Sequence, residues 1–111
     1  MNVLFEFSNN PFVNDLSSQY ARMALSISME NKITVIYKDD AIILSKKPFD
    51  ISISEIDFFD HERFLIEQEV DIFVFNAGKI YNKSFLKETV INISKNNLDE
   101  LYNMQDIIFR N

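Results

Sequence analysis

Three short runs of almost unbroken apolar residues constrain the fold of this chain more than any other feature of its sequence. The runs are NVLFEFS at residues 2–8, KITVIY at 32–37 and DIFVF at 71–75. They are rich in β-branched and aromatic residues, which favour strands. Because they do not alternate apolar with polar residues, they predict parallel strands whose two faces are both covered.

Segments with helical spacing alternate with these runs. Apolar residues recur every three or four positions between Asn14 and Met29, and Asn14 can cap the start of that helix. Three further helices are predicted at residues 39–47, 52–68 and 95–105, and two further strands at 89–93 and 106–110. In the last of these helices, Leu98, Leu101 and Tyr102 share one side.

Strands that alternate with helices imply right-handed crossovers and a parallel sheet. A chain of 111 residues has the size of one ordinary domain. We therefore predict a single α/β domain over residues 1–111, with a mainly parallel sheet of about five strands and helices on both faces. Because such sheets bind ligands beyond the carboxyl ends of their strands, the candidate ligand residues follow the first three strands: Ser8, Asn9, Asn10, Asp39, Asp40, Phe75, Asn76 and Gly78.

Composition excludes several classes of function. The net charge of −6 argues against a free-standing nucleic-acid-binding protein, because phosphate contacts need a positive surface. Gly78 is the only glycine, so the chain lacks the glycine-rich loop of dinucleotide or P-loop sites. The absence of cysteine excludes disulfides, thiolate zinc sites and a cysteine nucleophile. We expect no cofactor and no bound metal.

The segment DFFDHERF gathers four groups that could hold a metal or act as an acid and a base: Asp57, Asp60, His61 and Glu62. Adjacent positions on a helix point in different directions, so these side chains do not converge from one turn. We interpret the segment as a solvated helix face, and we rank a hydrolase built on its aspartates last. No catalytic residue is predicted.

The amino-terminal segment MNVLFEFSNN carries no basic leader and reaches a glutamate early, so we expect no signal peptide. No apolar run approaches the roughly 20 residues that a membrane span needs. The expected compartment is the cytoplasm, without membrane association.

Aromatic residues are unusually abundant for a small domain. The 11 phenylalanines and 4 tyrosines exceed what a core of this size hides, so some are expected at a surface that a partner covers. The candidates for this interface lie in the least periodic part of the sequence: Phe49, Phe58, Phe59 and Phe64.

Taken in order, four segments resemble the DsrE/DsrF/DsrH family, with its DsrF or TusC branch as the nearest match. They are NVLFEFS with its polar loop, ITVIYKDDAIILS, DIFVFNAGKI and the closing DIIFRN, which together span nearly the whole chain. The resemblance implies a small α/β subunit of a sulfur relay. In that family a persulfide-carrying cysteine lies near the end of the third strand, where this chain has Phe75, Asn76 and Ala77.

The resemblance also implies partners. It places the chain in a hetero-oligomer with a cysteine-bearing DsrE- or TusD-like subunit and a DsrH- or TusB-like subunit, as a non-catalytic member. The pathway would be the 2-thiolation of a tRNA wobble uridine, with tRNA as an indirect partner, or sulfur oxidation. The alternative is a self-assembling DsrE-like module that binds a small molecule at the strand ends without enzymatic activity, using Asn9, Asn10, Asp39 and Asn76.

Overall fold

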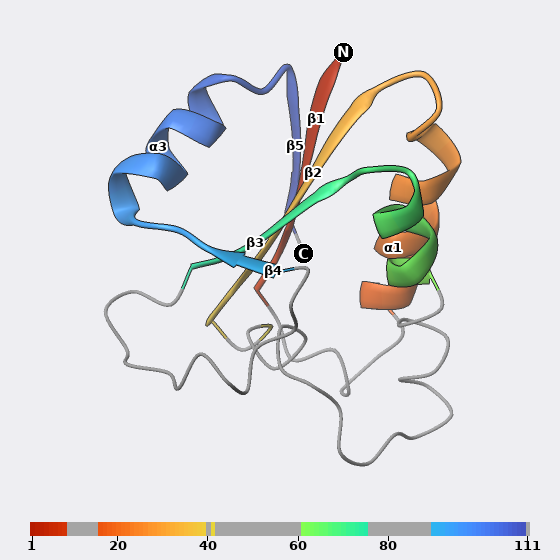
Figure 1. Ribbon diagram of the computed structural model, residues 1–111, viewed down its shortest axis with the longest axis horizontal. Helices are drawn as coiled ribbons and strands as arrows, with labels where there is room; N and C mark the ends of the chain where they lie inside the picture. Colours follow the sequence, from red (N-terminus) through yellow and green to blue (C-terminus); the bar gives the residue numbers. More distant parts are fainter. Residues whose placement is uncertain (9–15, 40, 42–60, 76–89, 111) are drawn as a thin grey trace.

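The computed structural model describes residues 1–8, 16–39, 41, 61–75 and 90–110. Seven labelled elements lie in these ranges (Figure 1): β1 (Asn2–Phe7), α1 (Leu16–Ile27), β2 (Lys32–Lys38), β3 (Asp71–Phe75), β4 (Val90–Asn92), α3 (Lys95–Asn103) and β5 (Ile107–Arg110). Residues 61–67 form a further helix.

All five strands pair in parallel in one sheet, in the order β4-β3-β2-β1-β5. The predicted α/β fold with a parallel sheet is therefore confirmed, and the observed strands differ from the predicted ones by at most one residue at either end. The strand order reverses at β1. β2, β3 and β4 follow one another on one side of it, and β5 lies on the other side.

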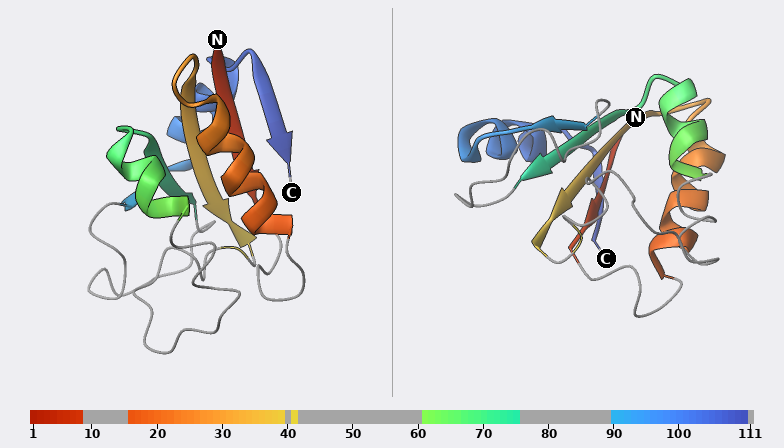
Figure 2. Two further views of the ribbon diagram at one scale, coloured as in Figure 1. Left: turned by 90° about the vertical axis from the view of Figure 1, so that its right-hand side faces the viewer. Right: turned by 60° about the horizontal axis from the view of Figure 1, so that its bottom comes forward.

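The helices form a layer on each face of the sheet. Figures 1 and 2 show α1 and the helix of residues 61–67 side by side on one face, and α3 on the opposite face. This arrangement follows from right-handed crossovers, because the connection from β1 to β2 and the connection from β4 to β5 run in opposite directions across the sheet. The two faces are called the α1 face and the α3 face below.

The α1 face holds the larger core. Alternate residues of β1 and β2 point into it because side chains in a strand alternate between the two faces. The Phe5 ring lies stacked on the Phe109 ring with 5.0 Å between centroids, and the Phe7 ring meets the Tyr37 ring edge-on at 5.8 Å. Small residues of α1, Ala21 and Ala24, are fully buried in this core and bring the helix close to the sheet.

The α3 face is less completely covered. Leu4, Ile36 and Leu98 are buried there, whereas Phe73 and Phe75 of β3 are only half-buried. The expectation that the third strand is buried on both faces holds fully for its α1 face, whereas on the α3 face Phe73 and Phe75 are buried only in part. In the described part of the chain, α3 has nine residues and packs its one buried residue, Leu98, against Leu4 of β1 and Ile36 of β2.

Helix α3 begins and packs as its sequence predicts. The Ser94 hydroxyl accepts a hydrogen bond from the Asn97 backbone N–H at 3.3 Å, which satisfies one of the free donors at the helix start. Leu98 is buried, and Leu101 and Tyr102 are half-buried on the same side. None of the helices in the described part of the chain is long and apolar enough to cross a membrane.

Candidate functional site

The structure describes three of the predicted ligand residues. Ser8 and Phe75 are half-buried, and Asp39 is exposed with a φ angle of 51°, in the left-handed region that aspartate tolerates better than most residues. Phe75 lies on the α3 face and is the register partner of Lys38 in β2. The remaining predicted ligand residues lie outside the described ranges: Asn9, Asn10, Asp40, Asn76 and Gly78.

A buried carboxylate marks the carboxyl edge of the sheet on the α3 face. Glu6, in β1, is only 3% exposed although it carries a charge in an otherwise apolar strand. The Tyr102 hydroxyl of α3 donates a hydrogen bond to Glu6 Oε2 at 2.5 Å, and Lys38 Nζ lies 3.1 Å from Glu6 Oε1. A charge in the interior is tolerated only when it is paired and hydrogen-bonded, and these two contacts supply both conditions.

Arg110 completes this group from the last position of β5. Its Nε lies 3.7 Å from Glu6 Oε1, and its guanidinium carbon lies 5.5 Å from the centroid of the Tyr102 ring. Burial, followed by the hydrogen bond to Glu6, raises the pKa of Tyr102 above its ordinary value of 10.0, so the phenol keeps its proton. We call Glu6, Lys38, Tyr102 and Arg110 the Glu6 cluster.

A second tyrosine–carboxylate pair lies on the α1 face. The Tyr37 hydroxyl donates a hydrogen bond to Glu62 Oε2 at 2.5 Å, and both residues are buried. Burial, followed by the negative charge of Glu62 and then by this hydrogen bond, raises the pKa of Tyr37 well above its ordinary value. The prediction that the segment around Glu62 is a solvated helix face is therefore wrong for this residue. The hydrogen-bonding tyrosine comes from a strand 25 positions earlier, which helical periodicity does not reveal.

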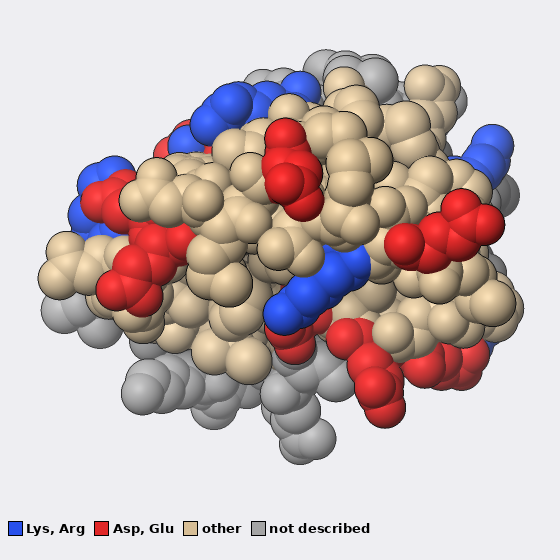
Figure 3. Space-filling view, turned by 90° about the horizontal axis from the view of Figure 1, so that it is seen from above, with Lys and Arg blue, Asp and Glu red and all other residues tan. Residues whose placement is uncertain are grey.

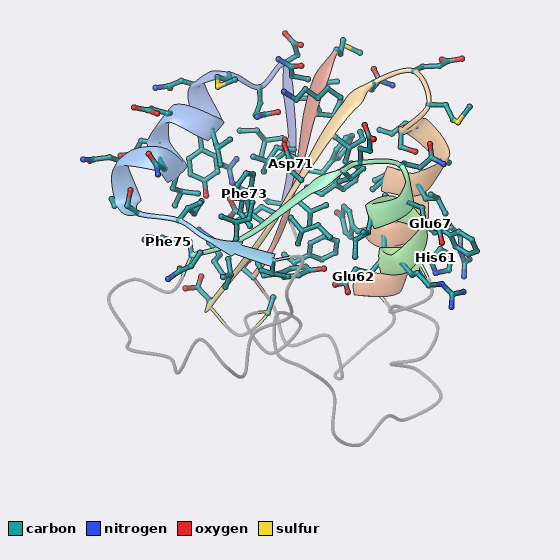
Figure 4. All side chains as sticks on the ribbon, viewed as in Figure 1. His61, Glu62, Glu67, Asp71, Phe73 and Phe75 are labelled. Carbon is teal, nitrogen blue, oxygen red and sulfur yellow. The ribbon has the colours of Figure 1, made fainter. Side chains whose placement is uncertain are left out.

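The neighbours of Glu62 in the sequence are arranged differently. His61 is half-buried, and it lies on the same helix as Glu62 (Figure 4). Asp57 and Asp60 lie outside the described ranges. Among the residues that the structure describes, no group of three or more histidine, aspartate or glutamate side chains is placed to hold a metal ion.

Phe64 is the one predicted interface residue that falls within the described ranges. Its side chain is 45% exposed, and the Arg63 guanidinium carbon lies 5.3 Å from its ring centroid. Exposure of a phenylalanine agrees with the expectation that part of the aromatic surplus reaches the surface. Whether a partner covers this ring stays a prediction, and the other three candidates, Phe49, Phe58 and Phe59, lie outside the described ranges.

The opposite end of the sheet holds a small cavity. A cavity of about 40 Å³ at the amino ends of the strands is lined by Thr34, Asp71 and Gln105 among others, and the buried Gln105 Oε1 has no hydrogen-bond partner. That volume suits a water molecule rather than an organic ligand, whose pockets measure roughly 300–1,000 Å³. Figure 3 shows acidic and basic side chains interspersed over this end of the molecule.

The sequence predicted the edge at which the Glu6 cluster lies and the loop that begins at Lys38, but none of the four residues of the cluster was among the predicted ligand residues. The available signal was a glutamate inside an apolar strand run, since a charged residue in a covered strand needs a partner. Lys38 and Arg110 each end a strand, and Tyr102 is on the side of α3 that was predicted to pack. Nothing in the local sequence joins Tyr102 to a residue 96 positions away.

Comparisons with known proteins bear on the fold. No protein-family model matches the chain, and a search of curated proteins finds no match. Among solved structures, the chain is similar to the YchN protein from E. coli with a TM-score of 0.74 and 12% identity. The similarity covers 100% of this chain and 99% of that one. YchN belongs to the DsrE/DsrF-like fold family, so this chain has a DsrE-like fold.

Proposed function

We propose that this chain is a non-catalytic subunit of a sulfur-relay complex, of the DsrF or TusC kind. One observation carries the proposal: the likeness to a DsrE-like structure extends over the whole chain, and the sequence contains no cysteine. Sulfur transfer through a persulfide needs a thiolate as nucleophile and carrier. A subunit of this fold without a thiol therefore contributes surface and support, and a cysteine-bearing DsrE-like partner contributes the chemistry.

The proposed role requires an exposed apolar surface that a partner can cover. Phe64 is 45% exposed on the helix of residues 61–67, next to the guanidinium of Arg63. Aromatic residues and arginine are enriched at protein interfaces because they bury a large area with few rotatable bonds. This pair supports an interface on the outer side of the α1 face, with the cysteine-bearing subunit as the partner.

Co-expression with a cysteine-bearing DsrE-like protein and a DsrH-like protein from the same genome, followed by native mass spectrometry, tests the proposal. We expect a hetero-oligomer that contains this chain, with persulfide sulfur found on the cysteine-bearing subunit after incubation with a donor. Persulfide transfer by the complex should depend on this chain. Failure of the chain to associate with either candidate protein would overturn the proposal.

The interface is tested separately by Phe64→Glu, which is expected to release the chain from the complex while leaving its circular dichroism unchanged. Met29→Glu is the matched control, because Met29 is also an apolar side chain, is 80% exposed and lies outside this helix. A complex that survives Phe64→Glu would remove Phe64 from the interface and would leave the subunit role intact.

A further inference from the structure

One carboxylate and two cations meet at the carboxyl ends of three adjacent strands. Glu6 in β1 is the register partner of Arg110 in β5, and Lys38 is the last residue of β2 on the other side of β1. All three side chains project to the α3 face, because they occupy alternate positions to the core residues of the α1 face. The cluster therefore lies where the order of the strands reverses, at the edge where open parallel sheets bind ligands.

The negative charge of this cluster is directed inward and its positive charges are directed outward. Glu6 is 3% exposed, whereas the side chains of Lys38 and Arg110 are 27% and 60% exposed. Within the Glu6 cluster, two cations against one carboxylate leave one positive charge in excess. This excess stands in a chain whose net charge is −6, so it is a local feature and not a reflection of overall composition.

The guanidinium of Arg110 has N–H donors that are available to a ligand. Its Nε lies 3.7 Å from Glu6 Oε1, which is an ion pair but longer than a hydrogen bond. A guanidinium has five N–H donors in a planar fork, and no residue in the described part of the chain accepts a hydrogen bond from it. The Tyr102 ring beneath the guanidinium, 5.5 Å away, holds it in place without using its donors.

We propose that Arg110 and Lys38 form a binding site for a small oxyanion of phosphate or sulfate shape, with Glu6 and Tyr102 as positioning residues. The arginine fork matches two oxygens of such an anion, and the lysine ammonium supplies a third donor and a charge. Glu6 anchors Lys38 and draws Arg110 toward the same edge. The site does not depend on the sulfur-relay proposal, since it needs neither a partner subunit nor a thiol.

Titration of the isolated chain with inorganic phosphate, followed by ¹H–¹⁵N NMR at a constant ionic strength of about 0.15 M, tests the site. Constant ionic strength matters because exposed charges are screened over roughly 8 Å under these conditions. We expect saturable shifts in the backbone amides of Lys38 and Arg110 and in Arg110 Nε–H, with sulfate competing for the same site. Shifts that do not saturate, or that spread equally over other lysines, would mean an adventitious ion only and would overturn the proposal.

Substitutions of Arg110 test its role in phosphate binding. Arg110→Gln is expected to weaken phosphate binding about tenfold or more, and Arg110→Lys is expected to restore part of it because the charge returns without the fork. Lys95→Gln is the matched control, since Lys95 pairs with Asp99 on α3 and is 67% exposed. It should change the affinity less than about twofold.

Glu6→Gln distinguishes an anion site from a purely structural charge network. Removing the carboxylate raises the excess positive charge, so phosphate should bind more tightly to the folded variant even if that variant is less stable. Weaker phosphate binding by Glu6→Gln than by Arg110→Gln, with both variants folded by circular dichroism, would contradict the proposed arrangement. Equal binding by the wild type and Arg110→Gln would also overturn it.

Discussion

Each face of the sheet holds a hydrogen bond from a tyrosine to a glutamate, and the two pairs differ in their surroundings. On the α1 face, Tyr37 and Glu62 are both buried, and the Tyr37 ring packs edge-on against Phe7. On the α3 face, Glu6 is buried but Tyr102 is half-exposed, and two cations approach the carboxylate from the rim. The same chemical pair therefore lies inside a closed core on one face and at an open edge on the other.

The extent to which helices cover a face of the sheet decides whether a buried carboxylate on that face can reach ligands from solvent. The α1 face is closed by two helices, so the pair there contributes to packing and to the fixed position of the helix of residues 61–67 (Figure 2). Of the described helices, only the nine-residue α3 lies on the α3 face, and the pair there holds the charged side chains of Lys38 and Arg110 within reach of solvent. Three predictions test this comparison.

The largest expected effect concerns the aromatic cores of the two faces. Phe5→Ala should lower the free energy of unfolding by about 3–5 kcal/mol, because Phe5 is fully buried and its removal leaves a cavity. Phe73→Ala should cost about 1–2 kcal/mol, since Phe73 is half-buried on the α3 face. Urea unfolding followed by circular dichroism measures both, with an unchanged m-value as the control. Equal losses would show that the two faces are equally closed.

A smaller effect is expected for the tyrosine hydroxyls. Tyr37→Phe should cost about 1–3 kcal/mol, because it leaves a buried carboxylate without its phenol donor. Tyr102→Phe should cost less, about 1 kcal/mol, since the phenol of Tyr102 is half-buried whereas that of Tyr37 is fully buried. Tyr20→Phe is the matched control, because Tyr20 contacts Phe5 and Phe7 through its ring. A larger loss for Tyr102→Phe than for Tyr37→Phe would reverse the comparison.

The smallest effect is a dependence of stability on alkaline pH. The pKa values of Tyr37 and Tyr102 are raised in the folded chain, so the folded state holds its phenolic protons at pH values where the unfolded state releases them. The contribution is fully present below about pH 10 and is lost as pH rises through the folded-state pKa values. Urea midpoints measured from pH 8 to pH 11 should fall above about pH 10.

The tyrosine variants separate the two contributions to this alkaline decline. Tyr37→Phe and Tyr102→Phe should each flatten the decline, and by a similar amount between pH 8 and pH 11, because both phenols keep their protons in the folded chain throughout that range. An unchanged pH profile in Tyr37→Phe would show that its phenol is not shielded from water in the folded chain.

The strands were predictable from local sequence because a strand with two covered faces requires an apolar residue at nearly every position. This held for β1 and β2, whose residues are buried at five successive positions. It held only in part for the α3 face of β3, where Phe73 and Phe75 are half-buried. The sequence pattern around a phenylalanine in a strand does not show how fully other elements cover its side chain. That coverage depends on the tertiary packing over the strand.

The sequence predicted the location of the candidate site but not the residues that form it. Parallel topology assigns ligands to the carboxyl edge, and topology follows from the order of elements along the chain. The contacts of Glu6 with Tyr102 and Arg110 join residues that are about a hundred positions apart in the sequence, and that of Glu62 with Tyr37 joins a helix to a distant strand. Because each charged residue was considered without its spatial neighbours, Glu62 was wrongly predicted to face solvent, and no role was predicted for Glu6.

The fold class follows from the sequence alone, because the alternation of apolar strands with amphipathic helices predicts a parallel α/β sheet, and the lack of cysteine removes thiol chemistry from this chain. Which charges meet, and which tyrosines donate to buried carboxylates, follow from the tertiary structure. The physical reason is that secondary structure depends on patterns within a few residues, whereas the energy of a buried charge depends on whatever side chains the fold brings within about 4 Å of it.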